Sequence, residues 1–124
     1  MAKKYEFTGK TKTHLGRTLK QIRAVVAIAA FSVNVGDIGG WIESENCLSH
    51  EGNAWVYGNA RVSGNARVSG NAWVYGNARV YGNAWVSGDA WVYGDAQVYG
   101  DAWVYGDAQV YGDAWVYGDA QVYG

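Results

Sequence analysis

Cysteine, histidine and long apolar runs are scarce in this chain of 124 residues. The single cysteine, Cys47, excludes an internal disulfide and is typical of a protein in a reducing compartment. This cysteine and the two histidines, His14 and His50, are too few and too far apart to form a metal site. No stretch approaches the ~20 apolar residues that a membrane-spanning helix needs. We therefore expect no disulfide, no metal and no membrane span.

The most apolar run, Ala24 to Phe31, reads AVVAIAAF and follows a start rich in lysine and arginine. This layout is also that of a signal peptide. The charged leader would span residues 1–23, would include Glu6, and alternates like a strand. A cytoplasmic location is the better interpretation.

The formal net charge is −1, but the two parts of the chain differ in sign. Residues 1–50 carry seven Lys or Arg against four Asp or Glu, and residues 51–124 carry three Arg against seven acids. The basic N-terminal part would suit nucleic acid, but a solvated ribbon accounts for it equally simply. Neither charge is strong enough to name a partner, and nucleic acid is not expected as one.

Glycine, in contrast, is abundant and regularly spaced. From Gly52 to Tyr123 the chain consists of twelve hexapeptides of the form Gly-(Asn/Asp)-Ala-x-Val-(Tyr/Ser). A fixed short period means that each unit buries its apolar side only by stacking on its neighbours. In each unit Ala and Val share one face, while residue x and Tyr or Ser share the other. Gly followed by Asn or Asp tolerates the left-handed backbone of a tight corner, so each unit is a short strand plus a corner.

Written from Val, the unit becomes Val-(Tyr/Ser)-Gly-(Asn/Asp)-Ala-x, which resembles the hexapeptide repeat of left-handed parallel β-helices. The resemblance implies an all-β, single-stranded, triangular β-solenoid of about four 18-residue coils, with an N-terminal β-hairpin and cap. Its left-handedness comes from the family and not from any propensity of the residues. The interior would hold one valine from each unit: Val56, Val62, Val68, Val74, Val80, Val86, Val92, Val98, Val104, Val110, Val116 and Val122.

A flat, two-sided coil of 12 residues is the rival shape. From Trp91 onward, position x alternates Trp and Gln, so the local period is 12. Recent duplication of a two-unit block would leave the same trace. We favour the triangle because a flattened solenoid has little room for an inward valine on every strand.

With 18 residues per coil, the outward side chains form vertical columns. The most aromatic face would carry Trp55, Trp73, Trp91, Tyr57, Tyr75, Tyr93 and Tyr111. An aromatic patch of this size is typical of an interface, although stacked rings also stiffen a solenoid. We therefore expect a homo-oligomer, a dimer or a trimer, that associates through these seven residues.

The corner residue changes from Asn to Asp at Asp89 and remains Asp to the end of the repeats. Vertical pairs of Asp could hold a cation or imitate nucleic acid. They lack the dense set of oxygen atoms that calcium requires, so solvated corners are the better interpretation.

The N-terminal residues divide into a β-hairpin and apolar strand (1–35) and a cap that leads into the solenoid (36–51), before the repeats of 52–124. The hairpin turn is expected near Leu15-Gly16. Residues 44–49 form a degenerate unit with Leu48 at the Val position, and His50-Glu51 then interrupts the period. The last coil has no comparable cap. Its edge would be continued by more chain, stacked on another molecule, or kept soluble by Asp.

The segment GDIGGWIE (36–43), followed by LSHE (48–51) and the repeats, resembles small hexapeptide-repeat proteins of bacteriophages and prophages, most of which have no assigned function. The resemblance implies the cytoplasm of a bacterial cell and a host protein as a partner.

Hexapeptide-repeat acyltransferases use a similar solenoid with a catalytic His between subunits. Both histidines of this chain lie outside the regular coils, no loop interrupts the repeats, and Ser63, Ser69 and Ser87 have no base beside them. An acyltransferase is therefore the least favoured hypothesis. We expect no catalytic residue and no cofactor.

The favoured hypothesis is a non-catalytic scaffold that acts by stoichiometric binding or by self-assembly through its aromatic faces, for example as a phage inhibitor of a host process. The alternative is a structural element that stacks through its open end.

Overall fold

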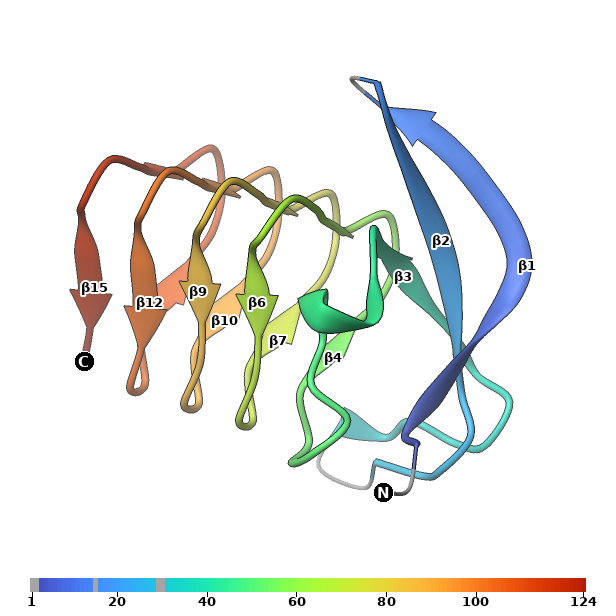
Figure 1. Ribbon diagram of the computed structural model, residues 1–124. Helices are drawn as coiled ribbons and strands as arrows, with labels where there is room; N and C mark the ends of the chain where they lie inside the picture. Colours follow the sequence, from blue (N-terminus) through green and yellow to red (C-terminus); the bar gives the residue numbers. More distant parts are fainter. Residues whose placement is uncertain (1–2, 15, 29–30) are drawn as a thin grey trace.

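The computed structural model describes residues 3–14, 16–28 and 31–124 and shows an all-β parallel solenoid with a hairpin at one end (Figure 1). Each hexapeptide supplies one strand of two or three residues that begins at position x. The twelve strands are β4 (Trp55–Val56), β5 (Arg61–Val62), β6 (Arg67–Val68), β7 (Trp73–Val74), β8 (Arg79–Val80), β9 (Trp85–Val86), β10 (Trp91–Val92), β11 (Gln97–Val98), β12 (Trp103–Tyr105), β13 (Gln109–Val110), β14 (Trp115–Val116) and β15 (Gln121–Tyr123).

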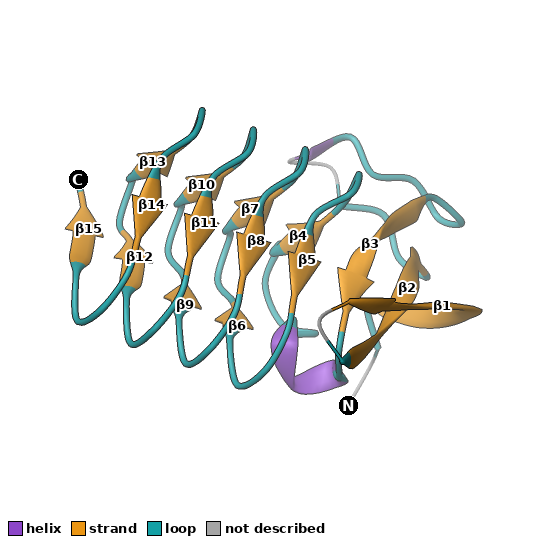
Figure 2. Ribbon diagram, turned by 90° about the horizontal axis from the view of Figure 1, so that it is seen from above, coloured by secondary structure: helices purple, strands orange, loops and turns teal. Residues whose placement is uncertain are grey.

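Three sheets form the sides of a triangular prism. Strands β4, β7, β10 and β13 form one side, β5, β8, β11 and β14 the second, and β6, β9, β12 and β15 the third (Figure 2). Every pair of repeat strands is parallel and joins residues 18 apart, such as Val74 with Val92. The 18-residue coil is confirmed, and the flat 12-residue coil is wrong. The coil winds left-handed (Figures 1 and 2).

The interior holds the Ala and Val side chains of the repeats. Ten of the alanines and eleven of the valines are buried, from Ala54 and Val56 up to Ala108 and Val116. Val122, in the last coil, is partly buried against this core. The alternation of the hexapeptide therefore separates inside from outside, because successive side chains of a strand point to opposite faces.

Glycine forms every corner of the solenoid. The repeat glycines have φ between 64° and 70°, the left-handed region that other residues avoid. They also stack closely, since a Cβ on Gly88 would lie 2.8 Å from the backbone nitrogen of Gly106. The next amide continues the stack, and the Asn71 N–H donates to the Gly88 carbonyl at 2.8 Å.

The N-terminal hairpin consists of β1 (Tyr5–His14) and β2 (Arg17–Ala24). Strand β3 (Ile38–Ile42) pairs antiparallel with β2 and parallel with β5, so the hairpin extends the second side of the prism. The expected turn lies between β1 and β2, although Leu15 is outside the described residues.

The apolar strand expected after the hairpin is wrong. Strand β2 ends at Ala24, and the described residues that follow form turns and one bridge, Ile28 with Val33. Ser32 has a φ of 56° and Gly36 a φ of 93°, so the chain turns sharply here and cannot remain extended.

The cap is itself part of a fifth coil. Ile42 pairs with Val62, and Leu48 forms a bridge with Val68, so both occupy the Val position 20 residues before their partners. A short 3₁₀ helix, η2 (Glu45–Cys47), lies between them. The offset is 20 rather than 18, which matches the two extra residues of His50-Glu51.

Two buried polar side chains fasten the N-terminus to the first coil. The Lys4 ammonium donates to the Ala54 carbonyl, and the Tyr5 hydroxyl donates to the Leu48 carbonyl at 2.6 Å. Strand β4 lies at the edge of its sheet, so Lys4 satisfies a carbonyl that no strand covers. Burial lowers the pKa of Lys4 to about 8, and burial, with smaller contributions from Glu45 and Cys47, raises the pKa of Tyr5.

These shifts predict a maximum in stability at alkaline pH. Between pH 8 and 10.5 Lys4 is protonated in the unfolded chain and loses its proton in the folded one, so the free energy of unfolding rises, by about 1–3 kcal/mol. Above about pH 10, Tyr5 ionises only in the unfolded chain, and stability falls again.

Urea unfolding between pH 7 and 11 measures this profile. Lys4→Met should abolish most of the rise and keep the fall. A wild-type profile that is flat or falling between pH 8 and 10 would contradict the assignment.

Candidate interaction surface

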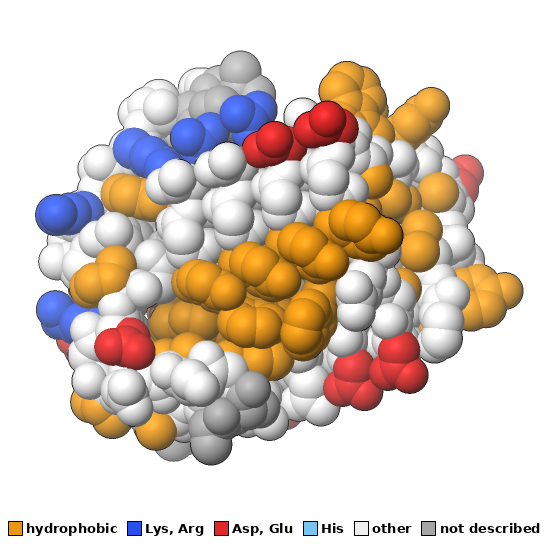
Figure 3. Space-filling model, turned by 180° about the vertical axis from the view of Figure 1, so that it is seen from behind, with side chains coloured by type: hydrophobic (Ala, Val, Ile, Leu, Met, Phe, Trp, Pro, Cys, Tyr) orange, Lys and Arg blue, Asp and Glu red, His pale blue; other side chains and the backbone are white. Residues whose placement is uncertain are grey.

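The side of the prism formed by β4, β7, β10 and β13, here called face 1, carries the predicted aromatic residues. Its outward columns are Trp55, Trp73, Trp91 and Gln109, beside Tyr57, Tyr75, Tyr93 and Tyr111. In Figure 3 a continuous apolar area runs along the molecule, as these columns require.

The four tyrosines form an unbroken ladder of stacked rings. Neighbouring centroids lie 5.1, 4.9 and 5.3 Å apart, and the rings are within 11° of parallel. Burial, and then the neighbouring tyrosine, raises the pKa of Tyr57 and of Tyr75. The ladder stiffens the face and leaves the ring edges and hydroxyls toward solvent.

The tryptophan column differs from the expected exposed stripe. Trp55 is only 1% exposed, because the N-terminus covers it and the Tyr5 ring packs edge-on at 6.4 Å. Trp55 is therefore not available as an interface residue. Phe31 stacks on Trp73 at 4.3 Å, which leaves Trp73 partly buried.

The open part of face 1 lies toward the C-terminal coils. Trp91 and Tyr93 are partly exposed, and Tyr111 is 58% exposed. Residues 31–38 rise over the first two coils instead and, with Trp55, Tyr57 and Trp73, line a hollow there. Face 1 is thus stepped, raised at one end and recessed at the other.

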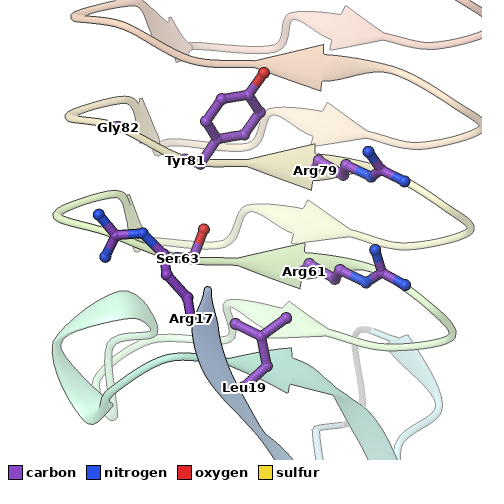
Figure 4. A pocket seen from close by; sticks show the side chains of 7 residues that line it. All are labelled: Arg17, Leu19, Arg61, Ser63, Arg79, Tyr81 and Gly82. Atoms are coloured by element: carbon purple, nitrogen blue, oxygen red, sulfur yellow. The ribbon is translucent and has the colours of Figure 1, made fainter. Parts of the chain in front are cut away.

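The border between face 1 and the second side carries charge. Its corner residues are Asn59, Asn77, Asp95 and Asp113, here called the first corner row. Arg61 and Arg79 stack in register on the second side and line a hollow with Asn59, Asn77 and Asp95. Both side chains extend back toward the start of their strands, and so toward this corner (Figure 4).

Burial, and then Arg79, lowers the pKa of Arg61. The charges along the first corner row therefore run from two arginines at the N-terminal coils to two aspartates at the C-terminal coils.

The corner amides form ladders that sequence reasoning missed. Asn59 donates to Asn77 at 3.2 Å, and Asn77 donates to Asp95 at 3.1 Å. The other two corners repeat the pattern, since Asn83 donates to Asp101 and Asn71 to Asp89. The signal is in the sequence, because residues of one corner recur every 18 positions. The change from Asn to Asp ends each ladder on an acceptor.

The other two sides carry shorter aromatic stacks. Tyr81, Tyr99 and Tyr117 stack on the second side, and on the third side Trp85 stacks on Trp103 at 5.3 Å. Aromatic columns thus stiffen all three sides. Face 1 differs in having four tyrosines in line and an adjoining tryptophan column.

Groups that could perform acid–base or metal chemistry are dispersed in the described part of the chain. His50 lies in the cap, where its ring stacks on Tyr5 at 4.1 Å, accepts the Lys4 N–H at Nδ1 and contacts Glu45 at 2.9 Å. The side chain of His14 is outside the described residues.

A hollow of about 210 Å³ between Arg17, Leu19, Ser63 and Tyr81 places no His or carboxylate beside the Ser63 hydroxyl (Figure 4). Among residues 3–14, 16–28 and 31–124, no group of three His, Cys, Asp or Glu is arranged to hold a metal ion, and no helix is long and apolar enough to cross a membrane.

The repeats match the sequence model of the YdcK β-solenoid repeat. The six matching segments are residues 54–70, 60–76, 72–88, 78–94, 96–110 and 108–124. Together they cover more than half of the chain. No curated protein matches the sequence.

Proposed function

The chain belongs to the YdcK β-solenoid repeat family, and from that premise we propose that it is a non-catalytic scaffold that pairs with a second copy of itself through face 1. The observation that carries the proposal is the continuous aromatic surface formed by Tyr75, Trp91, Tyr93 and Tyr111. Monomeric proteins rarely leave a contiguous apolar patch of this kind in water.

The size of face 1 sets the strength expected of the pair. Four strands about 4.8 Å apart and about 17 Å long cover roughly 300 Å². Standard interfaces bury about 800 Å² on each partner, so the pair should be weak and should dissociate at micromolar concentrations. A reversible scaffold, rather than an obligate oligomer, is the form of association that this surface supports.

Tyr93→Lys tests the face without disturbing either end of the solenoid. It places a charge in the open aromatic surface, so the dissociation constant of the pair should rise at least about tenfold. Tyr99→Lys is the matched control, because Tyr99 occupies the same repeat position and stacks between Tyr81 and Tyr117 on the second side. Light scattering gives the mass, and circular dichroism verifies the fold.

Other partners predict other results. A host protein, as the resemblance to phage and prophage hexapeptide-repeat proteins implies, would leave the isolated chain monomeric at every concentration. Stacking through the last coil would leave association unchanged in both lysine variants. Either result would refute pairing through face 1. A pair that is weakened only by Tyr93→Lys supports it.

A further inference from the structure

The charges beside face 1 have a direction. In the first corner row, the two N-terminal coils bring Arg61 and Arg79, and the two C-terminal coils bring Asp95 and Asp113. Within the part of the chain that the structure describes, Arg79 forms no salt bridge. Stacked in register, the two arginines repel each other, as do the two aspartates one coil apart.

The height of face 1 has the same direction. Residues 31–38 cover the first two coils, where Phe31 stacks on Trp73. The same segment leaves Val35 and Ile38 68% and 52% exposed. Over the last two coils the face is recessed, and its outward side chains are Trp91, Gln109, Tyr93 and Tyr111.

We propose that two copies pair face 1 to face 1 in antiparallel orientation, about a two-fold axis perpendicular to the solenoid axis. This inference rests on the proposed function. Arg61 and Arg79 of one copy then meet Asp113 and Asp95 of the second copy, and the two-fold axis repeats both contacts. The raised half of each copy enters the recessed half of the other, which brings Val35 and Ile38 near the partner's open aromatic surface.

The parallel arrangement fails on both grounds. Raised halves would meet and hold the faces apart. The first corner row would then lie against the opposite border of face 1, whose corner residues are Asn53, Asn71, Asp89 and Asp107. Acidic pairs would face each other at the C-terminal coils, and the arginines would meet only asparagines. Charge and shape therefore select the same orientation.

Two double variants test the orientation. Arg61→Asp with Arg79→Asp makes the first corner row acidic throughout, and Asp95→Arg with Asp113→Arg makes it basic throughout. Each variant alone should dissociate at least about tenfold more readily than the wild type, because every contact across the two-fold axis becomes repulsive. An equimolar mixture of the two should recover a 1:1 heterodimer. Sedimentation velocity at low ionic strength measures all three samples, since salt screens these contacts.

The outcomes separate this inference from the proposed function. If both double variants associate like the wild type while Tyr93→Lys does not, face 1 is the interface and the antiparallel orientation is wrong. A basic variant that pairs with itself more tightly than the wild type would also overturn the orientation, since it indicates the parallel arrangement. The chain with all four substitutions reverses the order of charges, and its pairing should match the wild type. Circular dichroism verifies that each variant is folded.

Discussion

Val80→Asp should destabilise the solenoid by about 3–5 kcal/mol, because it buries a carboxylate that has no partner. Val80 is fully buried in the middle of its sheet, with Val62 in register on one side and Val98 on the other. Each coil is held only by its neighbours, so damage at this position separates the cap from the last coils. Thermal or urea unfolding followed by circular dichroism measures the loss.

Gln97→Glu is the control for this substitution. Gln97 points outward on the same sheet, and its side-chain oxygen accepts the Tyr81 hydroxyl at 3.1 Å. Glu keeps an acceptor in that place, so stability should change by less than about 0.5 kcal/mol. Equal effects of the two substitutions would show that the assignment of inward and outward residues is wrong.

Gly88→Ala should cost about 2–4 kcal/mol through two separate effects. The φ of 65° strains any side chain, at about 1–2 kcal/mol. The new Cβ would also lie 2.8 Å from the Gly106 nitrogen and 3.1 Å from its oxygen, so the stacked coils would have to separate.

Gly118→Ala isolates the first of these effects. Gly118 has a φ of 64°, but a Cβ there would meet no atom within 4 Å. Its cost should be only the backbone strain, about 1–2 kcal/mol. If the two glycine variants lose equal stability in urea unfolding, close stacking of the corners contributes nothing.

The solenoid itself could be predicted from the sequence because its contacts repeat with the sequence. One period of six fixes the strand, the corner and the inward Val, and three units per coil fix every pairing at 18 residues. The degenerate unit around Leu48 could be recognised for the same reason, since its apolar residue keeps the spacing.

The contacts of the N-terminal fifty residues could not be predicted in this way. Nothing in the repeat indicates that Tyr5 covers Trp55, because that contact joins residues 50 apart from unlike elements. Phe31 ends an apolar run that alternates like a strand, yet the chain turns there and places its ring on Trp73. Tertiary packing, rather than local pattern, thus determines which part of face 1 remains open.

The most direct test of pairing through face 1 is the mass of the wild-type protein, with the two lysine variants, in sedimentation equilibrium from about 5 to about 500 μM, a range that brackets the micromolar dissociation expected of so small an interface. The account predicts that the wild type and Tyr99→Lys rise from the 13.5 kDa of one chain toward twice that mass and stop there, while Tyr93→Lys remains near one chain. A wild type that stays at 13.5 kDa throughout, or a mass that grows beyond two chains, would contradict it.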